Sequence, residues 1–140
     1  MAAEVKTIGP ELSDLVLSIN DWAYSVGEIE VDNSEGTDPI VIPSGSPADT
    51  DGTLITASAL AGGGTQTECL VLGKQIVDAG KVMKVPVLLR GPAILKKSGL
   101  PALDYEGASF NTTTLATEIA TLSPLIILRD ALTTVEEQTT

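Results

Sequence analysis

The stretch KVMKVPVLLRGPAILK, residues 81–96, holds two segments that are typical of β-strands. Within residues 81–89 every second side chain belongs to one apolar face, made up of Val85, Val87 and Leu89. This period of two predicts a strand that is buried on one side. Gly91-Pro92 marks a turn, and residues 93–96 form a shorter apolar segment after it. We therefore expect two strands joined by a tight connection.

Two further strands are predicted closer to the N-terminus. Residues 15–19 read Leu-Val-Leu-Ser-Ile, a plausible short strand. A helix over residues 11–19 with Pro10 in its first turn is the alternative, because proline suits that position. We favour the strand, because the aromatic and β-branched residues that follow prefer extended backbone, namely Trp22, Tyr24, Val26 and Ile29.

Residues 26–31 alternate cleanly between apolar and acidic side chains. Ile29 and Val31 fall on one face of the expected strand, and Glu28 and Glu30 fall on the other. Such a strand is half buried. The following residues, 32–53, are rich in glycine and proline and cannot form a helix, although Ile40, Val41 and Ile42 suggest an edge strand among them.

The second half of the chain adds more strands and one helix. We expect strands at residues 53–57 and 68–75, separated by the Gly62-Gly63-Gly64 loop. Asn111 is a favourable N-cap for a helix over residues 112–122, in which Leu115, Ile119 and Leu122 form one stripe. Pro124 ends that helix, and residues 125–128, Leu-Ile-Ile-Leu, then predict a short buried strand that closes the fold.

These elements predict an α+β fold that is mainly β. We expect three parts: an extended N-terminal arm with short strands at residues 1–50, a compact β-rich body with one late helix at residues 51–130, and a frayed tail at residues 131–140. At 140 residues the chain is long enough to build one hydrophobic core. Aromatic residues make up only 3% of the chain, so that core must consist of aliphatic side chains.

The composition argues against an enzyme. The chain has no histidine, which removes the commonest general base and the commonest metal ligand. Its single cysteine, Cys69, lies among apolar residues and is expected to be buried. The Asp49-Thr50-Asp51-Gly52 stretch resembles the start of a calcium loop but has Leu60 at the twelfth position, where such a loop needs glutamate. We therefore predict no catalytic residues, no metal site and no cofactor.

The charge distribution is uneven and excludes another class of partner. The net charge is −11, yet residues 69–97 alone carry a net charge of +5. An acidic total argues against nucleic-acid binding, which needs a basic surface. The basic middle segment is either a set of solvated strand edges or an interface where it faces the acids of another copy. No apolar run is long enough to cross a membrane, and no signal peptide is recognisable at the N-terminus.

Six segments follow one another between Asp51 and Asp130: Thr53-Leu54-Ile55-Thr56, Leu70-Val71-Leu72-Gly73-Lys74, Val85-Pro86-Val87-Leu88-Leu89-Arg90-Gly91, Ala93-Ile94-Leu95-Lys96-Lys97-Ser98-Gly99-Leu100-Pro101, the helix over residues 112–122, and Leu125-Ile126-Ile127-Leu128-Arg129-Asp130. In their order and spacing these segments resemble the head decoration proteins of lambda-like tailed phages. They are patterns of turns and strands rather than chemical signatures. Before Asp51 the chain matches the family only in kind, because its first segment is longer and more acidic.

The resemblance implies a structural virion protein. It would form a homotrimer at three-fold sites on the outer surface of the expanded capsid and stabilise the head against the pressure of packaged DNA. Its partners would be the major capsid protein and its own copies, and it would be made in the host cytoplasm. The N-terminal arm would become ordered on meeting the shell.

On this hypothesis the capsid contact lies in the arm, in Leu15, Val16, Leu17, Trp22, Tyr24, Ile29 and Val31. The trimer contact would use basic residues of the body, namely Lys84, Arg90, Lys96 and Lys97. Deleting residues 1–31 should then leave a folded trimer that does not bind capsids. An alternative for Trp22 and Tyr24 is packing on the body of their own chain. Alternatives for the whole protein are a tail or spike component, or a small non-enzymatic binding module.

Overall fold

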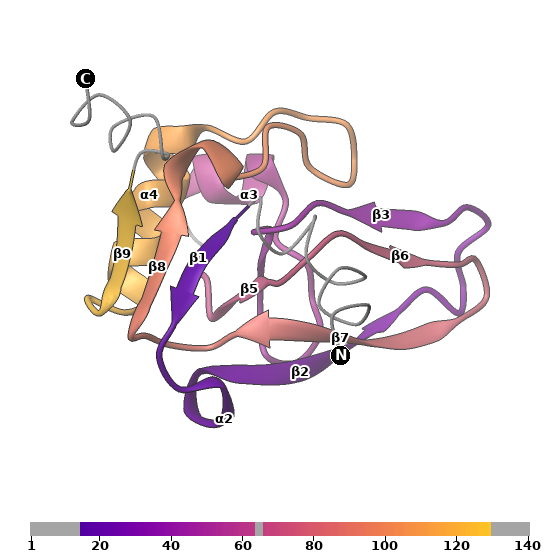
Figure 1. Ribbon diagram of the computed structural model, residues 1–140. Helices are drawn as coiled ribbons and strands as arrows, with labels where there is room; N and C mark the ends of the chain where they lie inside the picture. Colours follow the sequence, from indigo (N-terminus) through magenta and orange to yellow (C-terminus); the bar gives the residue numbers. More distant parts are fainter. Residues whose placement is uncertain (1–14, 64–65, 130–140) are drawn as a thin grey trace, which may run out of the picture.

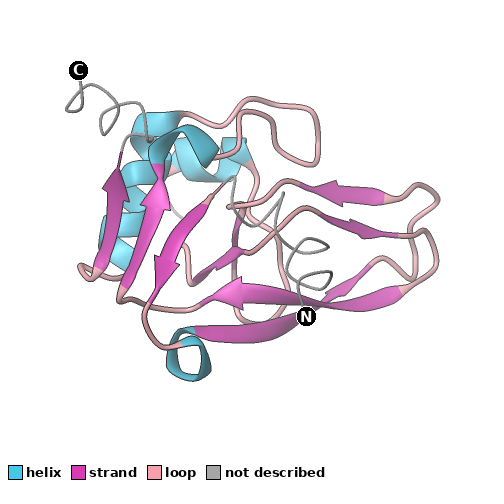
Figure 2. Ribbon diagram, viewed as in Figure 1, coloured by secondary structure: helices cyan, strands magenta, loops and turns pink. Residues whose placement is uncertain are grey.

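The computed structural model describes residues 15–63 and 66–129, and its fold is α+β and mainly β (Figures 1 and 2). Within these residues nine strands form two larger sheets and one two-stranded pair. The late helix is accompanied by two shorter helices that the sequence pattern did not indicate. The predicted fold class is therefore confirmed.

The larger sheet contains four strands in the order β2-β7-β5-β4. Its two long members, β2 (Val26–Asp32) and β7 (Val82–Leu88), are antiparallel and paired over their full length. The two short members are β5 (Cys69–Val71) and β4 (Pro47–Ala48). The alternation predicted for β2 is confirmed, because Ile29 and Val31 are buried while Glu28 and Glu30 are exposed.

The second sheet contains three strands in the order β1-β8-β9. Strand β1 (Val16–Ile19) is antiparallel to β8 (Ala93–Lys96), and β9 (Ile126–Arg129) is parallel to β8 on its other side. Helix α4 (Thr112–Leu122) covers one face of this sheet (Figure 1). The opposite face has no described element packed on it.

Helix α4 begins at the predicted cap. The side-chain oxygen of Asn111 accepts hydrogen bonds from the backbone N–H groups of Thr113 and Thr114, at 2.9 and 3.2 Å. Such a cap satisfies two of the N–H groups that a helix leaves unpaired at its start. Leu115 and Ile119 point from the helix into the core, as the predicted stripe requires.

The remaining elements are short. Strands β3 (Ile40–Ile42) and β6 (Gln75–Val77) pair with each other. Helix α2 (Trp22–Ser25) is a single turn between β1 and β2, and α3 (Ala57–Gly62) precedes the loop before β5. A 3-10 turn, η1 (Lys97–Gly99), follows β8.

The buried side chains form two clusters on opposite faces of β5 and β7. One cluster fills the space between β7, the three-stranded sheet and α4, and it includes Leu15, Leu70, Leu88, Leu95, Leu115, Ile119 and Ile126. The other lies between the four-stranded sheet and the β3–β6 pair, and it includes Ile29, Val31, Ile42, Val71, Val77, Val85 and Val87. Because Val87 and Leu88 are neighbours that point in opposite directions, the end of β7 is apolar on both faces.

In the structure, strands from the predicted arm at residues 1–50 pair with strands from the predicted body at residues 51–130. Strands β1 and β2 pair with β8 and β7, which lie in the middle of the predicted body. The short apolar segments of the arm thus supply strands to both sheets, because β7 and β8 each have an edge that needs a partner. Residues 1–14 of the predicted arm, and the predicted tail at 131–140, lie outside the described residues.

Three local predictions are also corrected. Residues 53–57 contain only an isolated bridge at Leu54 and then the start of α3, which Thr56 caps through its side-chain oxygen. The strand predicted at 68–75 is divided, because Gly73 adopts a positive φ of 75° between β5 and β6. Trp22 and Tyr24 lie in α2 rather than in a strand, since Asp21 caps that turn.

Candidate docking surface

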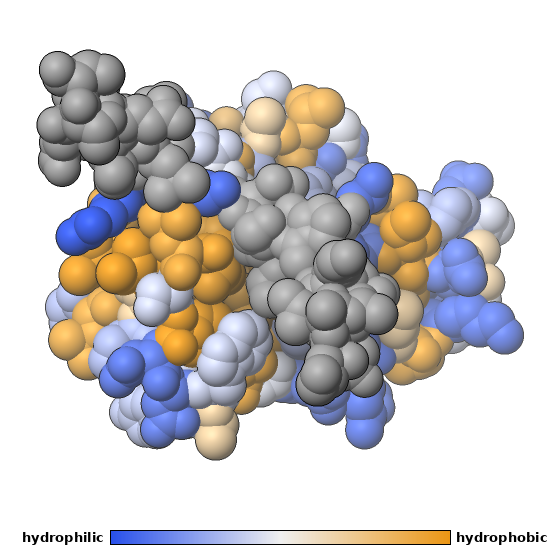
Figure 3. Space-filling model, viewed as in Figure 1, coloured by the Kyte–Doolittle hydropathy of each residue, from blue (hydrophilic) through white to orange (hydrophobic). Residues whose placement is uncertain are grey.

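The outer face of the β1-β8-β9 sheet is the most apolar exposed surface that Figure 3 shows. Side chains alternate along β8, so Ala93 and Leu95 are buried beneath the sheet while Ile94 and Lys96 reach its outer face. The same alternation along β9 places Ile127 on that outer face. We call this surface the outer sheet face, made up of Leu17, Ser18, Ile94, Lys96, Leu125, Ile127 and Arg129.

Several side chains of the outer sheet face are unusually exposed for their type. Leu125 is 56% exposed and Ile127 is 49% exposed. Leu17 lies at an irregularity in β1, where the pairing steps from Val16↔Leu95 to Ser18↔Ile94 and leaves Leu17 as the extra residue. This irregularity turns Leu17 outward, where it is 36% exposed. Contiguous exposed apolar groups of this kind mark interaction surfaces.

A shallow hollow of about 230 Å³ lies in this face. It is lined by Ser18, Asn20, Pro92, Ala93, Ile94, Leu125 and Ile127. Most of the lining is apolar, with the Ser18 and Asn20 side chains at one side. A hollow of this size fits one side chain of a partner rather than a free metabolite.

Basic side chains border the face at the C-terminal ends of its two parallel strands. Lys96 ends β8, Arg129 ends β9, and the two are paired in register. Lys97 follows in η1. None of these three forms an ion pair with an acidic side chain of the described residues. In Figure 3 strongly hydrophilic side chains border the apolar patch at this upper end.

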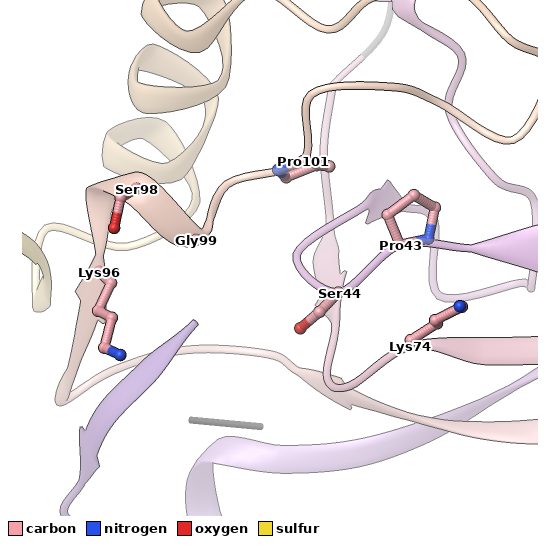
Figure 4. A pocket seen from close by; sticks show the side chains of 7 residues that line it. All are labelled: Pro43, Ser44, Lys74, Lys96, Ser98, Gly99 and Pro101. Atoms are coloured by element: carbon pink, nitrogen blue, oxygen red, sulfur yellow. The ribbon is translucent and has the colours of Figure 1, made fainter. Parts of the chain in front are cut away.

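A larger hollow of about 400 Å³ begins where Lys96 leaves the sheet. It is lined by Pro43, Ser44, Lys74, Lys96, Ser98, Gly99 and Pro101. Figure 4 shows the Lys96 ammonium group and the Ser44 and Ser98 hydroxyl groups turned toward the hollow, whereas the Lys74 side chain points away from Lys96. The Ser44 oxygen also accepts a hydrogen bond from the Gly73 N–H, at 3.0 Å. Strand β8 thus joins an apolar hollow at Ile94 to a polar hollow at Lys96.

The structure divides the predicted capsid-contact residues into three groups by their exposure. Leu15, Ile29 and Val31 are buried in the cores of their own chain, so in this fold their side chains face no partner. Val16 is half-buried and packs against the first core cluster. The remaining three are exposed, and the structure places Leu17 on the outer sheet face and Trp22 and Tyr24 in the adjacent α2.

The four predicted trimer residues do not form one cluster. Lys84 is exposed on β7, directly opposite Glu30 of β2. Arg90 contacts its own chain, because its guanidinium lies over the Tyr24 ring. Lys96 and Lys97 lie together at the border of the outer sheet face.

Sequence reasoning missed five residues of this face: Ser18, Ile94, Leu125, Ile127 and Arg129. The run of residues 125–128 predicted a fully buried strand, since four consecutive apolar residues show no alternation. The structure corrects this, because β9 is an edge strand with only one of its faces against the core. The alternation in Ile94-Leu95-Lys96 was the available signal.

The described residues contain no group of three or more histidine, cysteine, aspartate or glutamate side chains that could hold a metal ion. Burial, with a smaller contribution from the neighbouring Glu68, raises the pKa of the Cys69 thiol to about 12. None of the helices in this part of the chain has the length and apolar character that a bilayer crossing requires.

Comparisons with protein-family models, with curated proteins and with solved structures found no match to this chain.

Proposed function

We propose that this chain is a structural virion protein that binds the outer surface of the expanded capsid of a tailed phage and stabilises the head. The proposal also includes a homotrimer at three-fold sites and the major capsid protein as the partner. One observation of the structure supports it most directly: the outer sheet face exposes a contiguous group of aliphatic side chains with no described element covering them. The resemblance of residues 51–130 to head decoration proteins supplies the class of partner.

In this proposal the capsid contact lies on the outer sheet face, and no longer in the arm that the sequence predicted. Leu17, Ile94, Leu125 and Ile127 would meet the capsid, with α2 beside them as a second contact. Asn20 lines the small hollow, and α2, with its exposed Trp22 and Tyr24, begins two residues later in the chain. Aromatic residues at the border of an apolar patch are common anchors of protein interfaces.

The strength expected of one copy is modest. Burying the exposed part of each of the four aliphatic side chains contributes roughly 1 kcal/mol, at about 25 cal/mol per Å². Part of this gain is offset by the loss of translational and rotational freedom. A trimer makes the second and third contacts intramolecular, and avidity then reaches about 10² to 10⁴ over a single site. Weak individual contacts are therefore compatible with a saturated lattice.

Stabilisation of the head follows from selective binding. A protein that binds the expanded lattice and not the unexpanded one shifts the equilibrium toward the expanded state by its difference in affinity. The clamped lattice then resists the outward pressure of packaged DNA.

Co-sedimentation with empty expanded heads and with unexpanded precursor heads tests the proposal. Saturable pelleting with expanded heads alone, in multiples of three per site, is the expected result. Ile127→Lys should abolish pelleting, because a charge would be placed in the apolar contact. Val41→Lys is the matched control, since Val41 is similarly exposed but lies on the β3–β6 pair. Absence of pelleting with either kind of head would refute the proposal and favour a small binding module.

A further inference from the structure

We infer that the outer sheet face recognises an extended segment of a partner protein in which an apolar residue is followed, two positions later, by an acidic one. This inference rests on the proposed function, because it names the chemistry that the capsid partner would present to the same surface. It concerns the two rows of side chains that cross β8 and β9.

The first step is the register of the two parallel strands. Ile94 pairs with Ile127, and Lys96 pairs with Arg129. The outer sheet face therefore carries an apolar row followed by a basic row. Two residues along a strand span roughly 6.6 Å, so the rows are one side-chain repeat apart. An extended partner segment has the same repeat and matches both rows at once.

The second step is the charge of the basic row. Lys96 and Arg129 are like charges on neighbouring strands, and such pairs are destabilising. Neither has an acidic partner among the described residues, although the chain as a whole has a net charge of −11. A carboxylate from a partner would lie between the two cations and relieve their repulsion, and an Arg–carboxylate pair is among the stronger charged hydrogen bonds.

The third step is the space beside each row. The small hollow of about 230 Å³ lies at Ile94 and Ile127 and receives the apolar side chain. The larger hollow of about 400 Å³ lies at Lys96, with the Ser44 and Ser98 hydroxyl groups turned toward it (Figure 4). Its lining includes Lys96 but not Arg129, so a carboxylate held between the two cations would lie at the border of this hollow rather than inside it.

The apolar row also favours a peptide partner over a nucleic acid. Phosphate backbones are bound by extended basic surfaces, whereas here one basic row adjoins an aliphatic one. The occupant that uses both rows is a peptide segment rather than a polyanion.

The experiment uses the full chain and two synthetic peptides, acetyl-Thr-Leu-Thr-Glu-Thr-amide and the same peptide with lysine in place of glutamate. NMR titration follows the Ile94 and Ile127 methyl groups and the Arg129 side chain. We expect the glutamate peptide to shift these signals and the lysine peptide to leave them unchanged. Equal shifts with both peptides, or none with either, would overturn the inference.

Variants locate the two interactions. Replacing Lys96 and Arg129 by glutamine should lower the affinity for the glutamate peptide at least tenfold. It should also make binding less dependent on salt, since exposed charges are screened by salt. Lys84→Gln is the control, because Lys84 is an exposed lysine on the other sheet. Ile127→Ala should weaken binding without changing the salt dependence. If the double variant binds the glutamate peptide with unchanged affinity, the basic row does not bind the carboxylate.

Two further measurements separate this inference from its alternatives. A single-stranded oligonucleotide that shifts the Arg129 signals more strongly than the glutamate peptide would overturn the inference in favour of nucleic acid. Pelleting of the Lys96→Gln, Arg129→Gln variant with expanded heads then distinguishes the two proposals. If heads bind the wild-type and variant proteins equally, the proposed function stands and the acidic partner segment is refuted. If the wild-type protein binds the peptide but does not bind heads, only the capsid is refuted as its partner.

Discussion

The guanidinium of Arg90 lies over the aromatic ring of Tyr24, 4.8 Å from the ring centroid, and also donates a hydrogen bond to the backbone carbonyl of Tyr24. The Leu89 N–H donates to the Ser25 carbonyl at 2.7 Å beside this contact. The single turn α2 is therefore held against the end of β7. Arg90 thus holds the Tyr24 side chain and the α2 turn within its own chain.

Arg90→Ala should destabilise the fold by about 1–2 kcal/mol, because one cation–π contact and one charged hydrogen bond are lost. Urea unfolding followed by the fluorescence of Trp22, the single tryptophan, measures this directly. Lys84→Ala is the control and should change stability by less than about 0.5 kcal/mol. Equal effects of the two substitutions would contradict the role given to Arg90.

Asp104 ties a surface loop to the start of α3. Its carboxylate accepts hydrogen bonds from the backbone N–H groups of Ala57, Glu106 and Ala108, at 3.0, 2.9 and 2.8 Å. Burial alone would raise the pKa of Asp104, but these hydrogen bonds outweigh it and lower the pKa below its ordinary value of 3.8. Asp104→Ala should cost roughly 2–3 kcal/mol at pH 7, since three N–H groups lose a charged acceptor.

The pH dependence of this contribution has a definite sign. Because the pKa is lower in the folded state, the stabilisation is fully present above the unfolded value and is lost as the pH falls through the folded value. The stability difference between wild type and Asp104→Ala should therefore be largest at pH 7 and shrink below pH 3.8. Urea unfolding at pH 7 and at acidic pH tests this, with Glu106→Gln as a control. A difference that stays constant with pH would show that the carboxylate charge is not involved.

Cys69 should be inert in the folded protein. Its thiol is buried and points to the Ala48 carbonyl at 3.4 Å, and burial raises its pKa to about 12. At pH 8 only about one thiol in ten thousand would be ionised, and the thiolate is the reactive form. Reaction with a disulfide reagent should begin only at urea concentrations that unfold the chain. Rapid reaction of the native protein would contradict the buried position.

Substitutions at the two ends of β7 should destabilise the fold by different amounts, because only the end of this strand is buried on both faces. Leu88→Ala should destabilise the fold by about 2–5 kcal/mol, because Leu88 is fully buried in the first core cluster. Val82→Ala, at the exposed beginning of the same strand, should change stability by less than about 0.5 kcal/mol. Thermal or urea unfolding compares the two variants.

Deletion of residues 1–31 should unfold the protein, in contrast to the expectation drawn from the sequence. The deletion removes β1 and most of β2, and thereby exposes the buried faces of β8 and β7. Deletion of residues 1–14 removes none of the described strands and should preserve a cooperative unfolding transition. Circular dichroism and urea unfolding distinguish the two. A cooperatively folded 32–140 fragment would show that the first two strands are dispensable.

Local patterns were sufficient to predict most strands and the late helix. The alternation at Ile29 and Val31 and the cap at Asn111 are local signals that tertiary packing reinforces. Short helices were harder, because a single turn such as α2 depends on one cap at Asp21 and on packing against β7.

Pairing partners could not be read from the sequence. The pattern of β1 indicates a strand, but nothing local indicates that β1 pairs with β8 rather than reaching out to another protein. The difference between the predicted extended arm and the observed strand pairing has this origin. The outer sheet face was missed for a related reason, since the position of β9 at the edge of its sheet exposes Leu125 and Ile127.

The order of pairing has a consequence for the newly made chain. Strands β1 and β2 leave the ribosome early, yet their partners β8 and β7 follow only in the second half of the described sequence. Neither sheet can close during early translation, and contacts between distant segments form slowly. Ile29 and Val31 therefore remain exposed to solvent until β7 emerges, and this interval is when a nascent chain is most prone to aggregate.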